Sequence, residues 1–117
     1  MEMRAASDSV ERLAALAHGA RLALFRLLVQ AGPEGLPAGE IGRQLGRPPN
    51  SVSFHLARLR HAGLITSERK GRSIVYAASY ETIRGLVDYL TENCCGRSAE
   101  GCPPACRPED SNDNRRS

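Results

Sequence analysis

Residues 48–76 read PPNSVSFHLARLRHAGLITSERKGRSIVY, and the pattern of apolar residues in this stretch changes once, from helical to extended. In its first half Val52, Leu56 and Leu59 follow one another at i, i+4 and i+7, the spacing of an apolar stripe along one side of a helix. Most of the remaining positions there are polar or basic. We therefore expect residues 49–62 to form a surface helix with one buried side and one polar, positively charged side.

Proline and glycine mark where this helix begins and ends. Pro49 suits a first turn, where a missing N–H costs nothing, and Gly63 suits the left-handed residue just after a helix. Residues 64–69 and 73–76 are short apolar or β-branched runs, joined by the turn-forming sequence Lys70-Gly71-Arg72. A surface helix followed by a hairpin with a basic turn is typical of a winged helix-turn-helix, whose helix enters the major groove. The stretch therefore predicts binding to double-stranded DNA.

Positive charge is concentrated in the same part of the chain. The 117 residues carry a net charge of +3, but residues 41–72 hold seven lysine and arginine residues and one acid, Glu68. A local positive field is what contact with DNA phosphates requires. The alternative is a basic face that is only solvated, and that alternative does not explain why the helix, the hairpin and the charge coincide.

The predicted DNA contacts form two groups. Polar residues near the start of the helix are candidates for base edges or nearby phosphates, namely Asn50, Ser51, Ser53 and His55. Further along, Arg58, Lys70 and Arg72 are expected to hold phosphates or the flanking minor groove. For His55 the alternative is that its ring packs inside the protein.

Four further helices are expected, at residues 8–18, 20–30, 38–45 and 80–93. The first is expected to begin in a capping box formed by Asp8 and Glu11, and the last behind an N-cap at Ser79. A strong apolar stripe runs along this last helix through Ile83, Leu86, Val87 and Leu90. We therefore expect a mainly α-helical chain with a small β-hairpin, which forms a homodimer through its first and last helices.

Length and composition limit the domain count and the function class. Residues 1–95 are expected to form one DNA-binding and dimerisation domain, and residues 96–117, rich in Gly, Pro, Ser, Asn, Asp and Arg, a flexible tail. No apolar run exceeds five residues and no secretory signal is present, so we expect a cytoplasmic protein that does not enter a membrane. Catalytic motifs are absent, so no enzyme activity is expected, and the alternative function is a winged-helix module that binds proteins.

All four cysteines lie between positions 94 and 106, and in a reducing cytosol such a cluster is more often a metal or redox site than a disulfide framework. The Cα atoms of adjacent residues such as Cys94 and Cys95 are ~3.8 Å apart. Bridged cysteines need ~4.4–6.8 Å. Two neighbouring thiols and a third returned by a loop suit trivalent arsenic or antimony, which takes three sulfur ligands in a pyramid, because thiolates select soft ions.

Other interpretations of the cysteines remain open. A structural zinc or cadmium site would use all four thiolates, although structural zinc usually takes C-x-x-C pairs and this chain has CC and C-x-x-x-C. Thiol redox sensing is a second alternative, and the absence of any ligand a third. Cys94 alone could also pack as a small apolar residue, since it follows Leu90 by four positions.

With these residues in view, the chain resembles the ArsR/SmtB family of metal-responsive bacterial repressors over roughly residues 8–95. The resemblance rests on Ala20-Arg21-Leu22, on Ser51-Val52-Ser53-Phe54-His55-Leu56-Ala57-Arg58-Leu59, on Ala62-Gly63-Leu64-Ile65, and on Gly71-Arg72 with Tyr76. It departs from the family at Gly19-Ala20, where many members have Asp-Pro or Ser-Pro, and at Phe54, where relatives often have a polar residue. Residues 38–45 lack the C-x-C-x-x-C of many arsenic sensors, and residues 80–93 lack the histidine of zinc sensors.

The resemblance implies a homodimer that occupies an inverted-repeat operator without effector and leaves it when metal binds. It also implies that Cys94, Cys95 and Cys102 supply three thiolates to As(III) or Sb(III), as in arsenite-responsive members with this arrangement after the last helix. Cys106 is then a spare or a substitute. Either arsenite or a methylated trivalent arsenical could be the effector, and the methylated form needs fewer thiolates.

Overall fold

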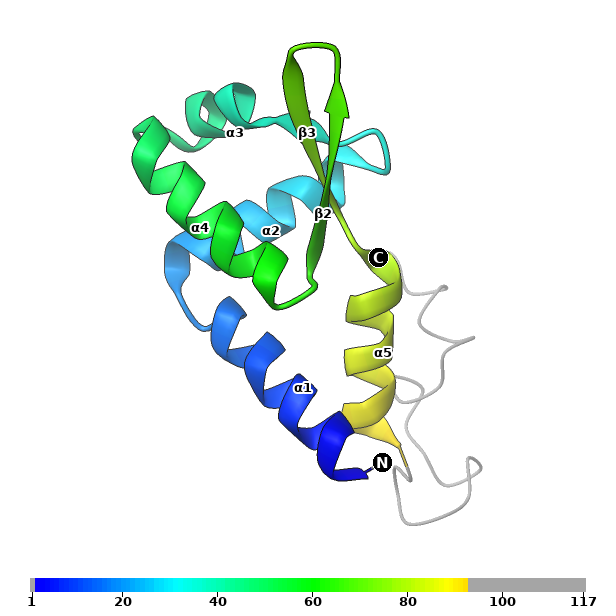
Figure 1. Cartoon of the computed structure of the whole chain (residues 1–117). Coiled ribbons are helices and arrows are strands. Elements are labelled where there is room, and N and C mark those ends of the chain that lie inside the picture. Colours follow the sequence, from blue (N-terminus) through cyan, green and yellow to red (C-terminus); the bar gives the residue numbers. More distant parts are fainter. Residues whose placement is uncertain (1, 93–117) are drawn as a thin grey trace, which may run out of the picture. The chain divides into compact units, whose positions relative to one another are not determined.

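The computed structural model of the chain describes residues 2–92, which form five helices and three strands (Figure 1). In chain order these are α1 (Glu2–Leu16), α2 (Gly19–Ala31), β1 (Leu36–Pro37), α3 (Ala38–Leu45), α4 (Pro49–His61), β2 (Ile65–Lys70), β3 (Ser73–Ala78) and α5 (Tyr80–Thr91). The chain divides into two units, the first ending at Leu86 and the second beginning at Val87, within α5. The fold described below is that of the first unit.

Helices α3 and α4 form a helix-turn-helix whose ends are fixed by glycine and proline. Gly46 ends α3 in the left-handed conformation with φ 66°, and Pro49 begins α4. After α4, Gly63 has φ 80°, its N–H donates to the Arg60 carbonyl and the Leu64 N–H donates to the Leu59 carbonyl. This pair of hydrogen bonds is a Schellman motif, and it turns the chain into β2. The predicted bounds of both helices are confirmed to within one residue.

The three strands form an antiparallel sheet in the order β1-β3-β2. The register of the β2–β3 hairpin pairs Ile65 with Ala78 and Lys70 with Ser73, and Gly71, at φ 64°, supplies the positive φ of the two-residue turn. On the other side of β3, Leu36 pairs with Tyr76. The hairpin is the predicted wing, and Figure 1 shows its turn extending beyond the helices.

The core lies where α1, α2, α3, α4 and the base of the hairpin meet. Its fully buried side chains include the stripe of α4 predicted from the sequence, together with residues from α2, α3 and the segment just before β2: Leu24, Leu28, Ile41, Val52, Leu56, Leu59 and Leu64. Two arginine side chains beside the core donate hydrogen bonds to carbonyl groups at helix ends. Arg21 Nε donates to the Ala15 carbonyl at 2.7 Å, and Arg12 Nε donates to the Ala62 carbonyl at 3.4 Å. The core therefore fixes the position of α4.

One prediction about the N-terminal half is wrong. The predicted capping box at Asp8 does not exist, because α1 begins at Glu2 and Asp8 lies inside it. The preceding residues continue the helix, since Glu, Met, Arg and Ala are good helix formers. The structure also adds the two-residue strand β1 before α3, which pairs with β3.

Helix α5 begins at the predicted N-cap. Ser79 Oγ accepts a hydrogen bond from the Thr82 N–H at 3.3 Å, and Glu81 lies in the first turn, where a carboxylate complements the helix dipole. The hydroxyl of Tyr80 donates to the Val29 carbonyl at 3.1 Å, and the Ser79 N–H donates to the Leu64 carbonyl at 2.8 Å. The start of α5 is therefore bonded both to the end of α2 and to the segment that follows α4.

Candidate nucleic-acid interface

Helix α4 has a buried side and an outward side that are sharply separated. Val52, His55, Leu56 and Leu59 are buried. On the opposite side, the positions at i, i+4, i+7 and i+11 are all exposed, and we call them the outward ridge: Asn50, Phe54, Ala57 and His61. No acidic residue occurs in α4. The surface available to a ligand is therefore neutral to positive along the whole helix.

The residues predicted from the sequence to contact DNA differ in how far the structure exposes them. Asn50, Ser53, Lys70 and Arg72 are exposed, Ser51 and Arg58 are half-buried, and His55 is buried. The Asn50 Oδ1 accepts the Ser51 N–H at 3.0 Å, which turns this amide toward its own helix terminus. The exposed and half-buried residues stay predictions, while His55 requires a correction.

His55 faces the core. Its side chain is 7% exposed, and its ring lies 4.9 Å from the ring of His18 and 5.5 Å from that of Phe54, measured between centroids. Burial, and then the charges of His18, Arg21 and Arg47, lower the pKa of His55 from its ordinary value of 6.5. The ring is therefore neutral and internal, so the alternative of internal packing replaces the predicted base contact. His18 is the N-cap of α2, where its Nδ1 accepts the Ala20 N–H.

Acidification is expected to destabilise the fold through His55. Because the pKa of His55 lies below 6.5 in the folded chain, the unfolded chain binds the proton more readily. The stability contributed by the neutral ring is thus complete above pH 6.5 and is lost as the pH falls below that value. Thermal unfolding followed between pH ~7.5 and ~5.5 should show a smaller fall in Tm for His55→Gln than for the wild type. His61→Gln, at an exposed histidine, is the control, and an equal fall in all three proteins would contradict the assignment.

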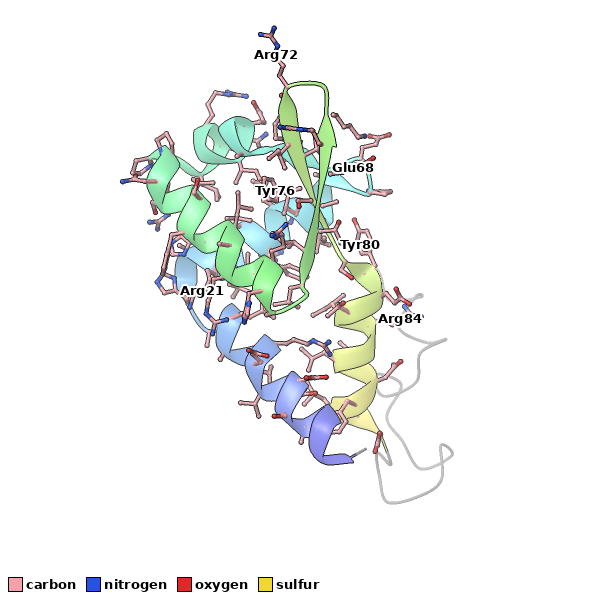
Figure 2. All side chains as sticks on the ribbon, viewed as in Figure 1. Arg21, Glu68, Arg72, Tyr76, Tyr80 and Arg84 are labelled. Atoms are coloured by element: carbon pink, nitrogen blue, oxygen red, sulfur yellow. The ribbon has the colours of Figure 1, made fainter. Side chains whose placement is uncertain are left out.

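Most cations of the interface have no acidic partner within the described residues. Arg43 pairs with Glu40, and Arg60 Nη1 donates to Ser67 Oγ at 2.9 Å, so both have internal roles. For the remaining five cations the structure gives no ion pair among residues 2–92: Arg47, Arg58, Arg69, Lys70 and Arg72. Arg72 projects from the hairpin turn away from the helices (Figure 2). These side chains are available to an external anion.

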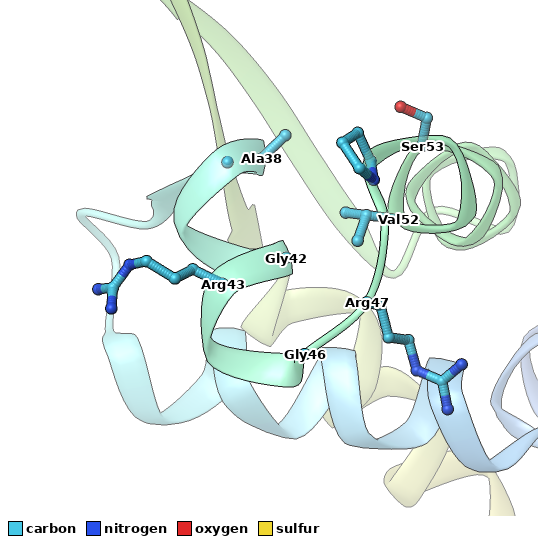
Figure 3. A pocket seen from close by; sticks show the side chains of 9 residues that line it. Ala38, Gly42, Arg43, Gly46, Arg47, Val52 and Ser53 are labelled. Atoms are coloured by element: carbon cyan, nitrogen blue, oxygen red, sulfur yellow. The ribbon is translucent and has the colours of Figure 1, made fainter.

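A groove of about 390 Å³ lies between α3 and the start of α4 (Figure 3). Val52 points into the space between the helices, whereas Arg43 and Arg47 point away from it in different directions. A Cβ added at Gly42 would lie 3.1 Å from the Arg47 carbonyl oxygen and 3.3 Å from Val52 Cγ2. The lining contains no His, Cys, Asp or Glu, so the groove offers no side chain that commonly binds a metal ion.

The predicted sensor is not part of the surface described here. Cys94, Cys95, Cys102 and Cys106, and the predicted tail at 96–117, lie outside the described residues. Over residues 2–92, no three His, Cys, Asp or Glu side chains are grouped so that they could hold a metal ion. In the same part of the chain no single helix is long and apolar enough to cross a membrane. Only the pair Ala6–Leu16 and Gly19–Ala31, bent by 99°, passes a test of length and composition.

Of the outward ridge, only Asn50 is predicted from the sequence as a DNA contact. Phe54 and Ala57, which lie in the middle of the exposed side, are left out. The signal was present, because the i, i+4, i+7 and i+11 positions that start at Asn50 lie opposite the apolar stripe that starts at Val52.

Comparison with known proteins identifies the family. Residues 16–68, from the end of α1 into β2, match a family model described as a helix-turn-helix domain. The HTH-type transcriptional regulator YgaV of Escherichia coli (strain K12) is 33% identical over 90 residues, which cover 77% of this chain and 89% of YgaV. The HTH-type transcriptional regulator NmtR of Mycobacterium tuberculosis is 34% identical over 88 residues, which cover 75% of this chain and 71% of NmtR.

Solved structures agree on the fold. The homodimeric winged helix-turn-helix DNA-binding domain of Mb0332 from Mycobacterium bovis, described as a possible ArsR-family transcriptional regulator, superposes with a TM-score of 0.64. The match has 23% identity and covers 84% of this chain and 91% of that one. The predicted winged helix-turn-helix is therefore confirmed, and relatives that are regulators also confirm the prediction that the chain is not an enzyme. On its motifs, its fold and these relatives, the chain belongs to the ArsR/SmtB family of helix-turn-helix transcriptional regulators.

Proposed function

We propose that this chain is a cytoplasmic repressor that binds an inverted-repeat operator as a homodimer and leaves it when trivalent arsenic or antimony binds its cysteines. The observation that carries the DNA-binding part is the acid-free outward side of α4 beside a hairpin turn with Lys70 and Arg72. A helix of this kind fits the major groove, and cations on the wing fit the phosphates beside it. Membership of a family of transcriptional regulators supports this docking.

The exposed apolar residues of the terminal helices support the homodimer. Val10 and Leu13 on α1 are 65% and 42% exposed, and on the last turns of α5 Val87 and Leu90 are 50% and 56% exposed. Covering such residues with a second copy of the chain removes apolar surface from water. A two-fold dimer requires half-sites about 34 Å apart, one helical turn, or a multiple of this distance.

The proposed effector follows from the cysteine cluster in the sequence. Cys94 and Cys95 follow the last residue of α5, Thr91, by three and four positions, and Cys102 is separated from them by a segment rich in small residues. An effector shifts the balance between two conformations only if it binds them with different affinities. The thiolates must therefore bind arsenic more tightly in the conformation that does not bind DNA. A coupling free energy of about 1–3 kcal/mol is typical of such linkage.

Fluorescence anisotropy with a labelled duplex, selected from a randomised pool by the wild-type protein, tests both parts of the proposal. The wild-type complex should weaken with rising salt and should dissociate when arsenite is added. Cys94→Ser, Cys95→Ser and Cys102→Ser should each bind the duplex normally but keep it in the presence of arsenite, since three thiolates are required. Cys106→Ser is the matched control and should still release the duplex.

The same measurement separates the competing functions. Unchanged release by arsenite in both Cys94→Ser and Cys95→Ser would remove this site from the mechanism. Release by zinc or cadmium that requires all four cysteines would point to a tetrahedral metal site, and release by an oxidant alone to thiol redox sensing. No binding to any duplex at low salt would favour a module that binds proteins.

A further inference from the structure

Phe54 is an aromatic side chain placed where the proposed function expects contact with bases. It lies on the outward ridge one turn after Asn50, and it is 64% exposed. Ala57 follows on the same ridge and is also exposed. The middle of the ridge is therefore apolar, although the helix carries a polar residue or a cation at most other exposed positions.

The core does not explain this phenylalanine. The side chains that anchor α4 are on the opposite side of the helix, and the only aromatic contact of Phe54 in the described chain is the edge-to-face approach to His55. That contact leaves most of the ring in water. A single exposed apolar residue is common on proteins and needs no explanation by itself. Here the neighbouring residues indicate which kind of partner would cover Phe54.

Those neighbours fit a base pair better than an apolar protein surface. Ser53 and Asn50, one and four positions before Phe54, are exposed, Arg58 four positions after it is half-buried, and α4 contains no acid. In the major groove, thymine is the base that adds a C5-methyl group to its hydrogen-bonding edge, and apolar side chains recognise it through that methyl. An apolar spot surrounded by hydroxyl, amide and guanidinium groups matches a thymine methyl surrounded by base edges and phosphates.

We infer that Phe54, with Ala57 beside it, determines sequence preference by contact with the C5-methyl of a thymine in each half-site. The inference rests on the proposed function, because it requires α4 to lie in the major groove. Phe54 acts here as a specificity residue, and Lys70 and Arg72 supply affinity that does not depend on sequence.

Replacing thymine by deoxyuridine tests the inference, because it removes the methyl group and keeps every hydrogen-bonding atom of the base. Duplexes that carry one such replacement at each thymine position in turn, with the selected sequence as reference, would be titrated with the full-length wild-type protein. At one position per half-site we expect a loss of about fourfold in affinity, the value for withdrawing one methyl group from an apolar contact.

The variant Phe54→Ala should bind the reference duplex more weakly and should no longer distinguish thymine from deoxyuridine at that position, while Phe54→Leu should retain part of the discrimination. Leu22→Ala, which truncates an exposed apolar residue of α2, is the control and should discriminate like the wild type. Circular dichroism of each variant checks that the protein is folded. We expect the Phe54 variants to fold, because Phe54 is exposed.

Sequence-selective binding with equal affinity for thymine and deoxyuridine at every position would overturn the inference and leave the proposed function intact. A loss on deoxyuridine that persists undiminished in Phe54→Ala would assign the methyl contact to another residue, and would also overturn it. Failure of the wild type to bind any duplex would overturn both, and would leave Phe54 as a contact for protein.

Discussion

Alanine at Gly35 is expected to lower the free energy of unfolding by about 3–5 kcal/mol, the largest effect of any single substitution considered in this chain. Gly35 has φ 72°, a conformation in which a side chain is strained. Its added Cβ would also lie 2.9 Å from the carbonyl carbon of Tyr76 and 2.9 Å from Val75 Cγ1, and closer still to the Tyr76 oxygen. The two Tyr76 atoms are backbone atoms of β3, so relief of this overlap requires β3 and the segment before β1 to move apart.

Chemical denaturation at a fixed protein concentration measures this effect, because a dimer's stability depends on concentration. Gly39→Ala is the matched control. Gly39 lies in α3 with nothing within 4 Å of an added Cβ, so the same change should stabilise the protein by about 0.5–1 kcal/mol through helix propensity. Equal effects of the two substitutions would show that backbone geometry around Gly35 is not what the structure describes.

The double variant Lys70→Ala with Arg72→Ala is expected to weaken DNA binding by about tenfold to a hundredfold at moderate salt. Both residues flank Gly71 at the hairpin turn, both are exposed, and neither has an ion pair among residues 2–92. Because the proposed dimer carries two copies of the hairpin turn, the double variant removes four phosphate contacts and should reduce the slope of log K against log salt by about 3.6. Anisotropy titrations over a salt series give affinity and slope together.

Arg84→Ala is the control for the single variant Arg72→Ala. Arg84 lies on α5, away from the hairpin turn (Figure 2), and it carries the same charge on an exposed side chain. Because the proposed dimer contains Arg72 twice, the salt slope should fall by about 1.8 for Arg72→Ala and stay unchanged for Arg84→Ala. A slope that responds equally to both would mean that net charge, and not the wing, governs binding.

The helix-turn-helix and the wing could be predicted because local chemistry determines their ends. Pro49 starts α4 and Gly63 ends it, Gly71 allows the hairpin turn, and Ser79 caps α5. Each of these signals acts within a few residues, so no knowledge of distant contacts is required. Strand β1 could not be found in this way, since two residues form a strand only when another strand is beside them.

Within the candidate site, the region of positive charge was predictable but the roles of individual residues were not. From the sequence, His55 stays open between a DNA contact and internal packing, although Val52, His55, Leu56 and Leu59 form the complete i, i+3, i+4 and i+7 pattern of a buried stripe. Phe54 is noted in the sequence only as a departure from the family, and it occupies the middle of the exposed side. For both residues, the position on the helix determines whether the side chain is buried or exposed, and the polarity of the side chain does not.

The bond from the Tyr80 hydroxyl to the Val29 carbonyl attaches the first turn of α5 to α2. The bond from the Ser79 N–H to the Leu64 carbonyl attaches the start of the same helix to the segment that follows α4. A change in the direction of this first turn would therefore reach two separate parts of the first unit through two hydrogen bonds. Tyr80→Phe would keep the fold and remove one of these two connections.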